Sequence, residues 1–152
     1  MTQEHKELLL KDICARLPYR VKCSFGINDA IYEICGINPT CCGASEIQAT
    51  QVKRSINGDF SLSRCKPYLF PLSSISEDQK YDFYCRFIKN DCNFDDFKKF
   101  YLYNGMWRCK LLTLTSLYDI EAMIEWFHKN HIDYRGLIEK GLAIDATNLN
   151  IY

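Results

Sequence analysis

The chain has none of the long apolar runs, glycine or proline repeats, or excess charge that mark several classes of protein. Its 152 residues include seven glycines and four prolines without a collagen-like period. No segment approaches the roughly 18 consecutive apolar residues that a transmembrane helix needs. Nineteen basic residues balance nineteen acidic ones, which argues against a protein that coats DNA without specificity. A hydrophobic content of 47% also separates the chain from disordered proteins.

Motifs for the common kinds of catalysis are missing as well. The sequence contains no GxSxG turn for a serine nucleophile, no HExxH zinc motif and no GxxxxGK[ST] or GxGxxG phosphate loop. His128 and His131 form a candidate metal pair at helical spacing, but a histidine near a helix C-terminus is also favoured by the helix dipole alone. We therefore expect no catalytic residue, no cofactor and no enzyme activity.

Nine cysteines are present, an odd number, and no two of them form a CxxC pair. The N-terminal sequence MTQEHKELLLKDICARLP does not predict a signal peptide, because charges interrupt its apolar residues. These observations predict a cytoplasmic protein whose thiols are reduced and act mostly as small core hydrophobes. Metal binding, and redox chemistry at the adjacent Cys41 and Cys42, are left as alternatives.

Hydrophobic periodicity predicts a helix followed by a strand-rich part. The helix covers Gln3–Arg16, and short strands follow at Tyr19–Phe25, Ala30–Ile37, Glu46–Ser55 and Asp59–Lys66. The dipeptide Asn57-Gly58 predicts a hairpin turn between the last two strands. We expect Lys66–Leu72 to be an extended segment at the sheet edge, because its two prolines cannot donate ladder hydrogen bonds.

The remainder of the chain predicts helices. Ser76 and Gln79 fit a capping box, and further helices are expected to start at Asn93 or Asp95 and at Ser116. A turn and a short helix are expected at Asp133–Ala143, followed by a tail that frays. The sequence thus predicts one α+β domain over residues 1–152: an N-terminal helix with a small antiparallel sheet or SH3-like partial barrel (about 1–75), then a helical half (about 76–152).

Local composition suggests two kinds of binding. The segment 53–66 carries Lys53, Arg54, Arg64 and Lys66 against Asp59 alone. If the hairpin forms, these cations either bind nucleic acid or protect a sheet edge from aggregation. The ten tyrosines favour a protein interface, since tyrosine is enriched at such surfaces.

Three segments carry a recognisable pattern: Lys6–Lys22 (KELLLKDICARLPYRVK), Lys66–Ser74 (KPYLFPLSS) and His131–Ala143 (HIDYRGLIEKGLA). They resemble an uncharacterised family of small proteins from gut bacteria and their phages. The resemblance implies a phage or mobile-element context, and hence the cytoplasm of a bacterial host, but no activity. Arg20 stands where the family usually has glycine after LPY, and Phe70 where arginine is usual in KPYLxPLSS.

The three segments are interpreted either as folding junctions or as a shared binding surface that includes Tyr68, Tyr134 and Arg135. We expect a non-enzymatic accessory protein that binds another macromolecule, with a host or phage protein as the partner. Nucleic-acid binding through the basic hairpin 53–66 and sequestration of a small signalling nucleotide are the alternatives. No membrane partner is expected, and the sequence does not predict an oligomeric state.

Overall fold

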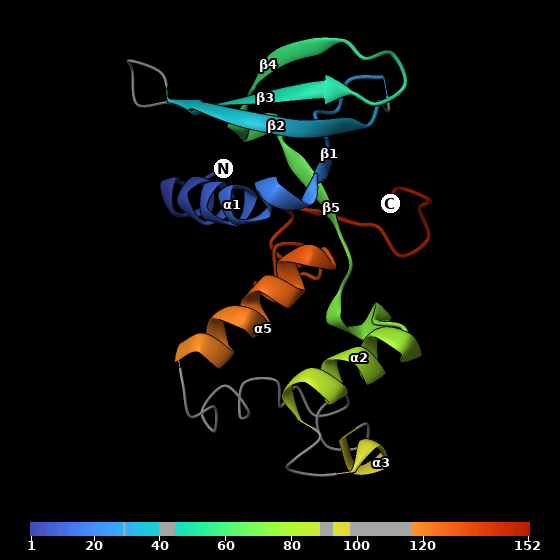
Figure 1. Ribbon diagram of the computed structural model, residues 1–152. Coiled ribbons are helices and arrows are strands. Elements are labelled where there is room, and N and C mark those ends of the chain that lie inside the picture. The colour runs from blue at the N-terminus through green and yellow to red at the C-terminus, as the bar shows by residue number, and fades with distance from the viewer. Residues whose placement is uncertain (29, 40–44, 89–92, 98–116) are drawn as a thin grey trace. The chain divides into compact units, whose positions relative to one another are not determined.

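The computed structural model describes residues 1–28, 30–39, 45–88, 93–97 and 117–152 (Figure 1). It has the predicted α+β architecture, with an N-terminal helix, a six-stranded, mostly antiparallel open sheet and helices in the second half. The chain forms two compact units: unit 1 contains residues 1–71 and 128–152, and unit 2 contains residues 72–127. The single domain expected for residues 1–152 stays a prediction. No helix within the described ranges is long and apolar enough to span a bilayer.

Helix α1 (Gln3–Arg16) begins and ends where the sequence predicts. Leu9 and Ile13, one turn apart, are fully buried in a core that they share with the sheet. The helix ends because Pro18 cannot continue the α-helical hydrogen bonding, and a 3₁₀ turn at Leu17–Tyr19 follows.

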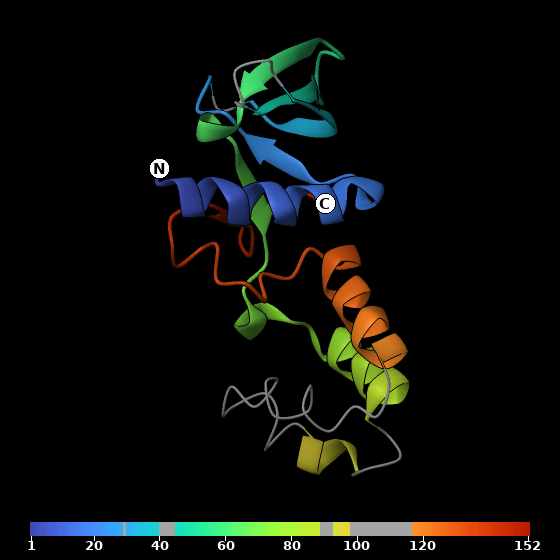
Figure 2. The same ribbon diagram turned by 90° about the vertical axis from the view of Figure 1, so that its left-hand side faces the viewer.

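Six strands form one sheet in unit 1, in the order β4-β3-β2-β1-β5-β6. In chain order they are β1 (Lys22–Ser24), β2 (Tyr32–Pro39), β3 (Ser45–Gln51), β4 (Asn57–Ser61), β5 (Lys66–Leu69) and β6 (Ile144–Asp145). All neighbours are antiparallel except β5 and β6. The described sheet is open, with β4 and β6 as its edges, and β4 lies at the top of both views (Figures 1 and 2).

The inner face of this sheet is apolar. Phe25, Tyr32 and Phe60 bring three rings together, with Phe25 and Phe60 stacked at 4.1 Å between centroids. Ile47 is fully buried in the same core. The inward side chains of β3 and β4 therefore hold the outer strands of the sheet on the core.

The predicted position of the hairpin turn is wrong. Asn57 and Gly58 belong to β4, where they pair with Thr50 and Ala49. The turn lies earlier in the sequence, and Ser55 takes the positive φ of 53° that the Asn-Gly pattern predicted for the later residues. The β-bridge register decides the turn position here, because burial of alternate strand residues outweighs local turn preference.

The prediction that Lys66–Leu72 lies at the sheet edge is also wrong, because β5 runs between β1 and β6. Pro67 is tolerated there for a geometric reason. The N–H of Ile34 donates to Val21 O, so Val21 and Cys23 both direct their backbone groups toward β2. Pro67 lies opposite Cys23 in a pair without hydrogen bonds, so no N–H of Pro67 is needed to bind β1. On the other side, β6 pairs only with the last two residues of β5, so Pro67 is not needed as a donor there either.

The short helix expected within Asp133–Ala143 is replaced by turns and bends. The carboxylate of Asp133 accepts the backbone N–H groups of Leu137 and Ile138, each at 2.8 Å. Gly141 then takes a φ of 68°, which favours glycine. The side-chain hydrogen bonds fix a turn where the sequence pattern alone indicated helix.

The expectation that the C-terminal tail frays is wrong. After β6, the N–H of Ala146 donates to Leu69 O at 2.8 Å. At the last residue, the ring of Tyr152 stacks on His131 with 3.8 Å between centroids. Polar and aromatic contacts thus hold the tail on unit 1.

Unit 2 contains α2 (Glu77–Phe87), α3 (Phe94–Phe97) and α5 as far as Phe127, although α5 itself extends over Leu117–Lys129. The predicted capping box of Ser76 and Gln79 is confirmed, with side-chain-to-backbone bonds in both directions. Phe83 is buried against several rings, among them that of Trp126. The predicted helix start at Ser116 and the pair Cys41 and Cys42 lie outside the described residues.

Candidate binding surface on the β3–β4 hairpin

The turn between β3 and β4 is exposed and is held by backbone hydrogen bonds. Gln51 donates to Ile56 O at 2.9 Å and accepts from Ser55 N–H at 2.8 Å, while Val52 donates to Ile31 O at 3.0 Å. All five residues from 52 to 56 are exposed. This ordered attachment fixes the direction in which the turn presents its side chains.

Two of these exposed side chains are large and apolar. Val52 is 46% exposed and Ile56 is 57% exposed. Between them stand Lys53 and Arg54, which have no ion-pair partner among the described residues. We call residues 52–56 the hairpin tip. It combines exposed apolar surface with two positive charges.

The structure does not gather the predicted basic cluster at one place. Lys53 and Arg54 lie at the tip, whereas Arg64 ends the 3₁₀ turn that follows β4 and Lys66 begins β5. All four are exposed. The five residues of β4 separate the two pairs by roughly 16 Å, at about 3.3 Å per residue. Each pair is therefore a separate local charge.

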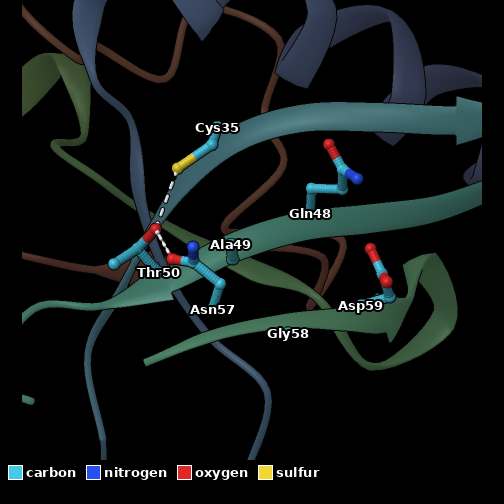
Figure 3. Close-up of a pocket in the computed structure, with 7 residues that line it drawn as sticks. All are labelled: Cys35, Gln48, Ala49, Thr50, Asn57, Gly58 and Asp59. Carbon is cyan, nitrogen blue, oxygen red and sulfur yellow. Dashed lines mark hydrogen bonds between the residues drawn. The ribbon is translucent and has the colours of Figure 1, made fainter. Parts of the chain in front are cut away.

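The outer face of β2, β3 and β4 carries a shallow polar pocket of about 290 Å³. A bulge in β2 leaves Cys35 without a partner in β3, because Ile34 pairs with Ala49 and Gly36 with Gln48. Figure 3 shows the row that results across the three strands: the Cys35 thiol lies 3.2 Å from the Thr50 hydroxyl, which donates to Asn57 Oδ1 at 2.7 Å. Gln48 and Asp59 complete the polar lining.

The other predicted residues belong to a mostly buried cluster in unit 1. Arg16 and Asp12 are both fully buried and form a two-bond ion pair, with Nε to Oδ2 at 2.7 Å. Arg135 Nε lies 3.2 Å from Asp12 Oδ1 as an ion pair, at an angle that does not make a hydrogen bond. The Tyr134 hydroxyl is 2.9 Å from His128 Nε2. Burial raises the pKa of Tyr134.

The candidate metal pair has separate environments. His128 contacts Tyr134, whereas His131 stacks on Tyr152 and has no hydrogen-bond partner at Nδ1 in the described part of the chain. Burial, with smaller effects of Arg16 and Lys22, lowers the pKa of His131 to about 4. Among the described residues, no three His, Cys, Asp or Glu side chains are placed to hold a metal ion together.

Tyr68 is 8% exposed, so its ring does not form part of an open surface. Its backbone carbonyl accepts a 2.9 Å hydrogen bond from the Tyr152 hydroxyl, which in turn accepts the N–H of Lys22 at 3.1 Å. Burial raises the pKa of Tyr152, which keeps this hydroxyl protonated. One hydroxyl group thus bridges β1 and β5.

Residues from each of the three segments that carry the resemblance meet in unit 1. Arg16 Nη2 donates to Ile132 O at 2.8 Å. Phe70 donates to His131 O and accepts from Asp133 N–H. These contacts are buried or backbone-mediated, and they favour the interpretation of the segments as folding junctions.

Comparison of the chain with protein-family models, with curated proteins and with solved structures gives no match. The geometry of the chain itself is therefore the basis for a functional proposal. Sequence reasoning found Lys53 and Arg54 but missed Val52 and Ile56, which flank them. No signal in the sequence marked Val52, because it falls within the predicted strand Glu46–Ser55, where an apolar residue is expected to face the core.

Proposed function

We propose that the protein is a non-enzymatic accessory protein of a phage or mobile element, and that its β3–β4 hairpin binds a partner protein. The observation that carries this proposal is the hairpin tip, where Val52 and Ile56 are exposed on either side of two unpaired cations. The biological context rests on the family resemblance. The absence of catalytic motifs from the sequence supports a binding role.

The physical gain on binding comes from two sources. Burying a whole Val or Ile side chain contributes about 1.5–3 kcal/mol, so covering the two half-exposed side chains contributes about 2 kcal/mol. Lys53 and Arg54 attract a partner with acidic groups around an apolar pocket and raise the association rate. The backbone bonds of Gln51 keep the tip ordered, so little conformational entropy is lost.

A retention experiment tests this function. The wild-type chain and the Val52→Ser/Ile56→Ser variant are immobilised and exposed to lysates of gut bacteria, and retained proteins are quantified by mass spectrometry. We expect a reproducible partner that the wild type retains and the double variant loses. Leu149→Ser is the matched control, because Leu149 is 43% exposed at a different place. Equal retention by wild type and double variant would contradict the proposal.

Nucleic-acid binding is the second candidate, and the unpaired Lys53 and Arg54 are the observation that favours it. It is tested by fluorescence anisotropy with labelled single-stranded DNA, single-stranded RNA and duplex DNA at low salt. If the tip contacts phosphates, the Lys53→Glu/Arg54→Glu variant lowers affinity at least tenfold and reduces the salt dependence. Affinity that the double charge reversal leaves unchanged would exclude the tip as a nucleic-acid site.

A further inference from the structure

The outer side of β4 exposes a run of backbone hydrogen-bonding groups. The N–H of Gln51 donates to Ile56 O, which makes this pair a hydrogen-bonded one. Pairs alternate in an antiparallel ladder, so the next pair, Thr50 with Asn57, is not hydrogen-bonded. The same alternation directs the N–H and C=O groups of Asn57, Asp59 and Ser61 away from β3. As β4 is a sheet edge, these groups face the open side.

The side chains beside this open edge are polar and carry negative charge. The outward-facing residues of β3 and β4 include two carboxylates, Glu46 and Asp59, and no cation. Both carboxylates are exposed, and neither has an ion-pair partner among the described residues. The small neighbours Asn57 and Ser61 leave room on either side of Asp59. The edge therefore favours a positively charged side chain opposite Asp59.

We infer that β4 binds an extended segment of a partner protein by strand addition, with a Lys or Arg of that segment opposite Asp59. This inference rests on the proposed function and names how the hairpin binds. The partner strand forms main-chain hydrogen bonds with Asn57, Asp59 and Ser61, and its basic side chain lies on the polar face with Asp59. A second copy of the chain fits less well, because antiparallel β4–β4 pairing about Asp59 sets two carboxylates opposite each other.

The structure offers a variant that blocks the edge and a control that matches it. Ser61 has a φ of −62°, which proline also adopts, and its N–H faces the open side. Ser61→Pro removes that donor and places a ring at the edge without breaking a β3 hydrogen bond. The Ser61 hydroxyl also accepts a hydrogen bond from Ser63 N–H, and Ser61→Ala removes the same hydroxyl while keeping the backbone donor.

The probe is a random heptapeptide library displayed on phage and selected on the wild-type chain. We expect selected peptides to alternate β-branched or aromatic residues with polar ones and to carry Lys or Arg at one fixed position. A synthetic peptide from this set should bind the Ser61→Ala variant as it binds the wild type, and the Ser61→Pro variant at least tenfold more weakly. Asp59→Asn should lower its affinity about fivefold.

Several results would overturn the inference: no enrichment, no preference for a basic residue, or equal binding to the Ser61→Pro and Ser61→Ala variants. A dimer in sedimentation analysis that Ser61→Pro dissociates would assign the edge to a second copy instead. A lysate partner lost by Val52→Ser/Ile56→Ser but kept by Ser61→Pro would refute strand addition while leaving the proposed function intact. The reverse pattern would support strand addition and remove the hairpin tip from the proposed function.

Discussion

Tyr152→Phe removes a single oxygen atom that links β1 and β5 just beyond the residues at which these two strands pair directly. The register of β1 and β5 pairs Ser24 with Lys66 and Cys23 with Pro67, so the next pair would be Lys22 with Tyr68. The Tyr152 hydroxyl occupies that position instead, 3.1 Å from Lys22 N and 2.9 Å from Tyr68 O. The hydroxyl thus replaces the direct backbone hydrogen bond that this pair would otherwise form.

The expected cost follows from what the phenylalanine keeps and loses. The aromatic ring still stacks on His131, so the apolar contact is retained. The N–H of Lys22 and the C=O of Tyr68 lose their partner, and an unsatisfied buried group costs about 1–3 kcal/mol. Tyr68 is 8% exposed while Lys22 is only half-buried, so water offsets part of the loss. We expect unfolding free energy to fall by about 2 kcal/mol, and the melting temperature by roughly 4–8 °C.

Urea unfolding followed by far-UV circular dichroism gives the free energy, and amide hydrogen exchange at Lys22 reports on unit 1 directly. The control is Tyr81→Phe in unit 2, where the side chain is 56% exposed and a change below about 0.5 kcal/mol is expected. The reasoning is refuted if Tyr152→Phe costs less than about 0.5 kcal/mol and the Lys22 amide stays equally protected. That result would mean that β1 and β5 close and pair directly without the hydroxyl.

Four further substitutions test individual contacts, each by urea unfolding. Asp12→Asn removes the counter-charge of the fully buried Arg16, and we expect a loss of about 3 kcal/mol. Stability should fall as pH decreases from 6.5 to about 4, because His131 is protonated in the unfolded chain and neutral in the fold; His131→Asn should reduce this slope. Gly141→Ala should cost about 1 kcal/mol because φ is 68°. Arg20→Gly should raise stability by up to about 1 kcal/mol, because φ is 57° and the exposed ion pair contributes little.

Each of these expectations has a contrary result. A loss below about 1 kcal/mol for Asp12→Asn would show that water hydrates the Arg16 guanidinium or that another group supplies its counter-charge. If the unfolding free energy of His131→Asn depends on pH as that of the wild type does, carboxylates and not His131 cause the dependence. Gly141→Ala should cost more than Gly141→Asn, since asparagine tolerates positive φ, and equal costs would contradict the backbone argument. Destabilisation by Arg20→Gly would mean that the arginine side chain contributes more than its exposed ion pair implies.

The helices were predictable from sequence where a local signal decides the structure. The Thr2 side chain accepts the N–H of His5 at the start of α1, and Pro18 ends the helix, so both boundaries depend on residues next to it. The Ser76–Gln79 capping box is a contact within four residues, so the sequence contains all of it. In such cases the residues that form the sequence pattern are also the residues whose contacts stabilise the helix.

The sheet interior was less predictable, because its energetics depend on residues far apart in sequence. The tolerance of Pro67 in β5 depends on the direction of the Cys23 backbone, which in turn depends on pairing with β2. The order of the C-terminal segment depends on Tyr152 reaching strands that lie far earlier in the chain. From propensity alone, a proline in a strand is expected at the sheet edge and a chain terminus is expected to be disordered. Tertiary contacts overturn both expectations here.

The candidate site shows the same division between local and long-range information. Lys53 and Arg54 are visible as part of a charge cluster in the sequence. Their separation from Arg64 follows from the length of β4, and the sequence did not predict this separation because it placed the turn at Asn57-Gly58. Burial removes Tyr68 from any exposed surface, and the register alone reveals that Asp59 carries free backbone groups beside an unpaired carboxylate. The proposed strand addition therefore depends on which strand is the edge of the open sheet and on which backbone groups face outward. Both follow from pairing and cannot be assigned to any residue by its type.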